Sequence, residues 1–147
     1  SLLEGLIMPK FSQRSISNLA TCHIDLQVLF NEVIKTFDCV VLEGYRNKKD
    51  QEKAFNAGNS KLHYPHGKHN QNPSNAADVY PYEPKVTVDW NDNARFHYFA
   101  GYVMGIAQKL KDEGRITHAI RWGGDWDRDT EIKDEKFRDT GHFEIIP

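Results

Sequence analysis

Hydrophobic residues recur at roughly helical spacing between residues 15 and 35, and Ser15 or Ser17 can cap the start of a helix there. Two further helices are predicted, over 48–57 and from about 92 to 113. Each is followed by a glycine that can end it. The pattern of the chain therefore contains three predicted helices.

Short runs rich in apolar and β-branched residues predict strands. They lie at 39–42, 76–80, 118–122 and 142–146. Helices and strands are interspersed, and the connections between them permit antiparallel pairing. We therefore predict the α+β class, with a small central antiparallel sheet flanked by helices.

The composition fits one folded domain. With 147 residues, 39% of them hydrophobic, and no linker-like segment, the whole chain 1–147 is expected to form a single domain. The 19 Lys and Arg residues nearly balance the 21 Asp and Glu residues, which argues against a nucleic-acid partner. Cys22 and Cys39 are expected to be buried thiols, although the pair also fits one disulfide.

No apolar run approaches the roughly 20 residues that a membrane span needs. The first residues, SLLEGLIMPK, lack the charged-then-apolar pattern of a signal peptide, so synthesis in the cytoplasm without a signal peptide is expected.

Histidines dominate the candidate chemistry, because three of the seven, His63, His66 and His69, fall within one loop. The sequence has no His-Glu-x-x-His, Gly-x-Ser-x-Gly or Cys-x-x-Cys motif and no glycine-rich phosphate loop. With these motifs absent, a metal site built from histidine and carboxylate ligands is the remaining candidate for a functional site.

His69, Asp78 and His142 supply two imidazoles and one carboxylate, the ligand number of a catalytic zinc that keeps its fourth position for water. Asp139 lies three residues before His142, close enough to act as general base on that water. Taken singly, His69 and Asp78 could be an ordinary loop histidine and an ordinary strand-edge aspartate. An aspartate in an apolar strand is nevertheless costly to bury unless it is paired or binds a metal.

The segments that hold these residues resemble a known family. Lys68-His69 with the Ala-Ala-Asp at 76–78, and the segment DTGHFE at 139–144, resemble the zinc peptidases that include bacterial D-alanyl-D-alanine carboxypeptidases and phage L-alanyl-D-glutamate endolysins. The Gly-Tyr-Arg at 44–46 and the segment RWGGDW at 121–126 resemble further parts of that family, the second being typical of its endolysin branch. The resemblance extends from about residue 43 to the C-terminus.

The resemblance implies a hedgehog/DD-peptidase-like fold and a single catalytic Zn²⁺ held by His69, Asp78 and His142. It implies that Asp139 is the catalytic base and that Arg46 binds or polarises the substrate. Gln51 is a weaker substrate-binding candidate, for which an exposed position on a helix is the favoured interpretation.

Many members place six residues between the first histidine and the aspartate, whereas His69 and Asp78 are separated by eight. His66 or His63 therefore stays open as an alternative to His69.

The implied substrate is bacterial peptidoglycan, cut between L-Ala and D-Glu of the stem peptide by a monomer without a separate wall-binding domain. A D-alanyl-D-alanine carboxypeptidase or dipeptidase would use the same ligands. A non-catalytic zinc-stabilised binding module is a further alternative. A non-haem Fe(II) oxygenase is disfavoured, because it usually needs His-x-Asp spacing and a strand-rich barrel.

Two features of the endolysin-like segment have competing interpretations. Acidic residues alternate over 125–131 as in a calcium loop, but the loop lacks its glycine, and Lys136 stands where the bidentate glutamate is expected. A solvated acidic loop is favoured, with a weak regulatory Ca²⁺ site as the alternative. Trp122 and Trp126 either line a substrate groove or, for Trp122, pack in the core.

Overall fold

The computed structural model describes residues 8–147, so the start of the chain on which the signal-peptide expectation rests lies outside the described part. Its elements are α1 (Gln13–Leu19), α2 (Ile24–Val33), β1 (Cys39–Glu43), α3 (Lys48–Asn56), the short 3₁₀ helix η2 (Lys68–Asn70), β2 (Ala76–Pro81), α4 (Asn93–Asp112), β3 (Ala119–Gly123) and β4 (Asp139–Ile146). The strands form one sheet in the order β1-β2-β4-β3, with every neighbouring pair antiparallel. The predicted α+β class is confirmed.

The prediction of one helix over 15–35 is wrong, because the chain turns between α1 and α2. The backbone N–H of His23 donates to the carbonyl of Ser74 at 2.8 Å, so residues next to the break pair with a distant segment instead of continuing the helix. His23 then caps α2 by accepting a hydrogen bond from the Asp25 N–H on its Nδ1 at 3.0 Å. The cap of α1 is Ser12, not Ser15 or Ser17.

The other helix ends follow their local signals. Asn47 caps α3 through a 2.9 Å hydrogen bond from the Asp50 N–H, and Gly58 follows the helix with φ +80°. Strand β4 starts at Asp139, three residues earlier than predicted, because Asp139 pairs with Gly123 of β3. No helix within 8–147 is long and apolar enough to cross a bilayer.

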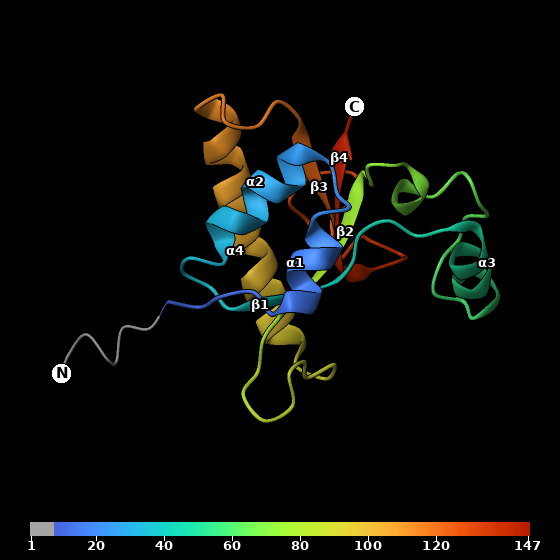
Figure 1. Cartoon of the computed structure of the whole chain (residues 1–147), viewed down its shortest axis with the longest axis horizontal. Helices are drawn as coiled ribbons and strands as arrows, with labels where there is room; N and C mark the ends of the chain where they lie inside the picture. The colour runs from blue at the N-terminus through green and yellow to red at the C-terminus, as the bar shows by residue number, and fades with distance from the viewer. Residues whose placement is uncertain (1–7) are drawn as a thin grey trace.

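Helices α2 and α4 pack against each other and cover one face of the sheet, whereas α3 lies on the opposite side (Figure 1). The core between the helices and the sheet is fully apolar at its centre. Its largest buried members are Phe30, Phe99, Phe143, Leu26, Leu29 and Leu110. Cys22 and Cys39 are buried free thiols in this core, as predicted, and do not form the alternative disulfide.

Strands β2 and β4 divide their residues between two faces, since successive side chains of a strand point to opposite sides. Ala77, Val79, Phe143 and Ile145 face the core. The intervening residues face the side on which α3 lies: Asp78, Tyr80, His142 and Glu144. All polar chemistry of these two strands is thereby collected on one face.

A register shift in β1 brings a third strand to this face. Val41 pairs with Val79, but Glu43 pairs with Asp78, so one residue is left over between them. Such a bulge reverses the side to which the following residue points. Asp78 also pairs with His142, so three neighbouring strands present Glu43, Asp78 and His142 side by side.

Candidate active site

The structure brings His69, Asp78 and His142 together, each from a different element: η2, β2 and β4. The Nε2 atom of His69 lies 3.2 Å from Asp78 Oδ1, and the Nδ1 atom of His142 lies 3.3 Å from the same oxygen. Their candidate ligand atoms all fall within 4.8 Å of one another. His63 and His66 are exposed outside this group, and His63 pairs with Glu52 instead.

Each imidazole is held in place by a hydrogen bond from the ring nitrogen that points away from Asp78. Nδ1 of His69 lies 2.7 Å from the carbonyl oxygen of Gly44, which only a protonated nitrogen can satisfy. Nε2 of His142 lies 2.8 Å from Glu144 Oε1, and Arg121 holds that carboxylate at 2.9 Å. A metal-binding histidine is oriented in this way by a hydrogen bond from its other ring nitrogen. The donor set therefore fits a divalent metal such as zinc.

The charges of the three groups suit a cation at the same place. Burial would raise the pKa of Asp78, but the neighbouring His69 and His142 outweigh it and hold that pKa well below its usual range. Burial likewise opposes a charge on His142, yet its hydrogen bonds to Asp78 and Glu144 raise its pKa to about 10. A metal ion that replaces the proton between the imidazoles and Asp78 meets an ionised carboxylate.

Asp139, the predicted base, stands beside this cluster at the start of β4. Its Oδ2 atom lies 3.9 Å from Nδ1 of His142, and its side chain reaches into two cavities. Burial and the charge of Asp78 raise the pKa of Asp139, and the nearby His142 counteracts part of this effect. A raised pKa makes a carboxylate a better proton acceptor near neutral pH.

Arg46 contacts three partners at the edge of the cluster. Its guanidinium donates to Glu43 at 2.7 Å and to Gln51 Oε1 at 3.1 Å, and it lies 3.6 Å from Asp78 Oδ2. Gln51 itself is fully buried and donates to the carbonyl of Leu62 at 2.7 Å. Gln51 is thus no exposed helix residue, and its position holds the Arg46 fork in place.

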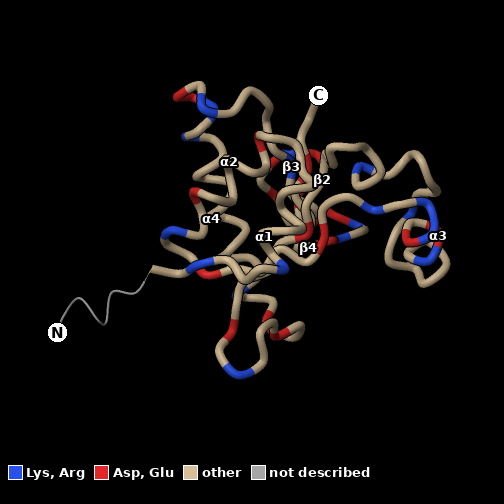
Figure 2. Tube along the Cα trace, viewed as in Figure 1, with Lys and Arg blue, Asp and Glu red and all other residues tan. Residues whose placement is uncertain are grey.

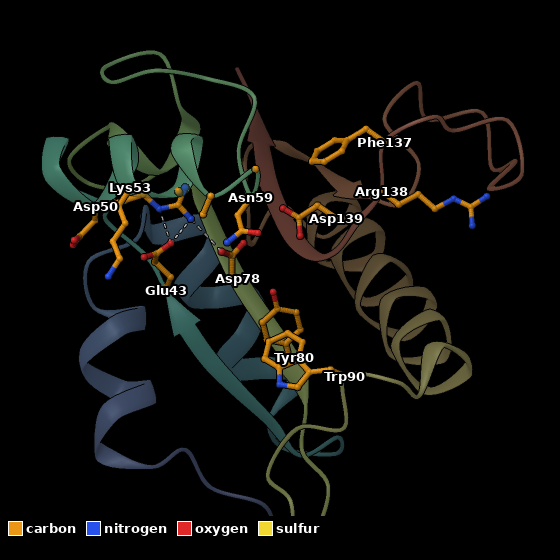
Figure 3. A pocket seen from close by; sticks show the side chains of 14 residues that line it. Glu43, Asp50, Lys53, Asn59, Asp78, Tyr80, Trp90, Phe137, Arg138 and Asp139 are labelled. Carbon is orange, nitrogen blue, oxygen red and sulfur yellow. Dashed lines mark hydrogen bonds and ion pairs between the residues drawn. The ribbon is translucent and has the colours of Figure 1, made fainter.

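Two cavities of about 710 and 310 Å³ meet at this cluster. Arg46, Asn59, Phe137 and Asp139 line both. In the larger cavity, Glu43, Asp78 and Asp139 point inward, whereas Arg138 points away (Figure 3). Basic and acidic residues are interspersed along the described trace, including α3 beside this cavity (Figure 2).

Two wall residues, Tyr80 and Trp90, escaped the sequence analysis, whereas Trp126 was already a candidate groove residue. Tyr80 and Trp90 line the larger cavity. The signal for Tyr80 was available, because it follows Asp78 by two residues on one strand, whereas nothing local marks Trp90. Trp126 lines the smaller cavity, 5.5 Å from the His142 ring, while Trp122 is buried in the core.

Two other groups could hold a cation by geometry among the described residues. In the first, Asp25 Oδ2 accepts hydrogen bonds from the N–H groups of Thr117 and His118 and lies 2.7 Å from His118 Nδ1, so it joins α2 to the start of β3. The second contains Asp125, Asp127, Asp129 and Glu135 of the acidic loop. Exposed acidic groups of this kind are common without a metal, so the calcium interpretation stays a prediction.

Comparisons with known proteins show similarity in both sequence and fold. A model of the phage L-alanyl-D-glutamate peptidase family matches residues 7–146. Among solved structures, the L-Ala D-Glu endopeptidase ChiX of Serratia marcescens is similar with a TM-score of 0.69 and 22% identity, covering 98% of this chain and 95% of that chain. A search of curated protein sequences found no match. The solved structure shows a shared fold, and the family model covers nearly the whole chain.

Proposed function

The chain belongs to the phage L-alanyl-D-glutamate peptidase family and acts on peptidoglycan, and we propose that it cleaves with one zinc ion held by His69, Asp78 and His142. The observation that carries the proposal is the orientation of the two imidazoles. Each turns one nitrogen toward Asp78 Oδ1 and ties the other to an acceptor, Gly44 O or Glu144. When bound, zinc supplies the Lewis acidity that activates water and polarises a carbonyl.

Asp139 has the position and environment of the proton carrier. Its carboxylate lies beside His142 and opens to both cavities, so it can reach a water that attacks the scissile carbonyl from the shared space. It takes the proton of that water and then delivers it to the departing amine of D-Glu.

Arg46 is suited to a substrate oxygen. Glu43 and Gln51 fix its guanidinium while it still lines both cavities. A fixed guanidinium can stabilise the negative charge that develops on the carbonyl oxygen or bind a carboxylate of the stem peptide.

The test is digestion of purified peptidoglycan with zinc and with a chelator, followed by mass spectrometry of the new termini. We expect chelator-sensitive release of new D-Glu amino termini. Release of D-Ala would assign the carboxypeptidase reaction instead, and bound zinc without cleavage would favour the binding module. A His142→Ala variant is expected to lose the metal, and an unchanged zinc content would contradict that ligand.

Further expectations accompany this function. We propose that the protein acts at the bacterial cell wall as a monomer. The organisation of the chain as one peptidase domain and a weak calcium site at 125–131 stay predictions from the sequence.

A further inference from the structure

An exposed tryptophan stands on the wall of the larger cavity and has no part in the chemistry above. Trp90 lies in the loop before α4 and keeps 60% of its surface exposed, although it lines the same cavity as Asp78 and Asp139. A single exposed apolar side chain on a protein surface needs no explanation. An exposed indole on the wall of a catalytic cavity, however, is placed to contact the substrate.

The indole is supported from below by aromatic packing. Its ring meets Tyr80 edge to face with centroids 4.7 Å apart, and Tyr80 meets Phe96 in the same way at 5.4 Å. Gly141 makes room for the Tyr80 ring, since a Cβ atom at that position would collide with it. Tyr80 and Trp90 lie together in the cavity below Asp78 (Figure 3). The platform is therefore held by neighbours that belong to the fold.

The distance between this platform and the reaction centre can be compared with the substrate. Tyr80 follows Asp78 by two residues on β2, which separates them by about 7 Å. The centre of the Trp90 ring lies a further 4.7 Å from that of Tyr80, so this path from Asp78 to Trp90 is about 12 Å long. In peptidoglycan, L-Ala is joined by an amide bond to the lactyl group of N-acetylmuramic acid, and an ether bond joins that lactyl group to the sugar ring. These two units span about 7 Å when extended, so the sugar ring occupies the next few ångströms.

We propose that Trp90, supported by Tyr80, binds the N-acetylmuramic acid ring that precedes the scissile bond. The inference rests on the proposed function, because it takes the cleaved bond to be the one after L-Ala. The electron-rich face of the indole attracts the C–H groups on the apolar side of a sugar ring. The stem peptide beyond the cleaved bond then extends into the smaller cavity.

The second aromatic pair of the site does not offer the same surface. Trp126 stacks on Phe137 with an interplanar angle of 11°, and Lys61 Nζ lies 5.1 Å from the Phe137 ring centre. Trp126 is also 5.5 Å from the ring of His142. This pair lies directly against a metal ligand, too near the reaction centre for a sugar that stands two units away.

The experiment compares two substrates of the zinc-loaded full chain. One is the N-acetylmuramyl stem peptide, and the other is the N-lactoyl stem peptide, which keeps the lactyl amide but lacks the sugar. For each, kcat/KM is measured by chromatography of the released peptide. We expect the wild type to prefer the muramyl substrate by about tenfold, the upper range for one aromatic contact.

Trp90→Ala is expected to abolish this preference, and Trp90→Phe to retain part of it. The matched control is Tyr98→Ala, which removes an aromatic residue of α4 that is 67% exposed and lies outside both cavities. It should leave both rates unchanged.

Equal cleavage of both substrates by the wild type would overturn the sugar site while leaving the proposed function intact. An equal loss on both substrates in Trp90→Ala would overturn it as well, since Trp90 would then act without the sugar. Failure to cut either substrate with zinc bound would contradict the proposed function, and the sugar site would fall with it.

Discussion

Glu144 provides a direct test of how this protein orients His142, a proposed metal ligand. Its carboxylate is only 4% exposed and accepts from His142 Nε2 at 2.8 Å and from Arg121 at 2.9 Å. In Glu144→Ala, the imidazole loses the bond that fixes its tautomer and ring plane, and Arg121 loses its buried partner. A hydrogen bond to a charged group contributes about 1.5–3 kcal/mol. Loss of such an outer partner typically weakens metal binding about 10- to 100-fold.

We therefore expect the zinc Kd of Glu144→Ala to rise about 10- to 100-fold, as measured by competition with a fluorescent chelator at neutral pH. Glu144→Gln keeps the size of the side chain and an acceptor oxygen, so its Kd should lie between those of Glu144→Ala and the wild type. This second variant also answers the question if the alanine variant does not fold.

Glu52→Ala is the matched control, because Glu52 also binds a histidine, His63, at 2.7 Å, but on the surface and away from the proposed metal ligands. Its zinc affinity should equal that of the wild type. If folded Glu144→Ala binds zinc as tightly as the wild type, the sheet alone orients His142 and the reasoning is refuted.

Three further predictions concern catalysis and stability. Asp139→Asn should lower kcat by about 10²–10⁴-fold with zinc content unchanged by elemental analysis, and full activity would exclude Asp139 as the base. Arg46→Lys keeps the charge but cannot bridge Glu43 and Gln51, so kcat/KM should fall about 100-fold; a wild-type value would show that charge alone suffices. Burial opposes ionisation of Asp25, but bonds from His118 and Thr117 outweigh it and lower its pKa. Asp25 therefore stabilises the fold above about pH 4 and less as pH falls. In thermal unfolding, Asp25→Asn should have a lower Tm at pH 7, and this deficit should shrink as the pH falls below about 4; a constant deficit would contradict the role of the charge.

The elements with local signals were predictable, and those set by distant pairing were not. Asn47 and Gly58 mark the ends of α3 in the sequence itself. The break between α1 and α2 depends instead on hydrogen bonds to Ser74, some fifty residues along the chain, which no helical periodicity can reveal. The early start of β4 depends likewise on the partner that Gly123 offers to Asp139.

The residues of the candidate site likewise include some that the sequence predicts and others that only the fold reveals. His69, Asp78 and His142 were selected by residue type, order and family resemblance, all of which are properties of the sequence. The roles of Glu144 and Gln51 are properties of the fold, because one depends on the pairing that sets Arg121 opposite Glu144, and the other on a loop that closes over α3.

The packing of the core also fixes the position of Asp78 in the candidate site. On β2, Ala77 and Val79 face the core while Asp78 faces the site, so a register slip of one residue would exchange a buried valine for a carboxylate. Burying that carboxylate without partners would cost far more than a hydrogen bond contributes. The pairing of Asp78 with His142 is therefore enforced by the apolar side of the same strand, before any metal binds. For this reason we expect substitutions that repack the core around Val79 to alter the geometry of the proposed metal ligands as well.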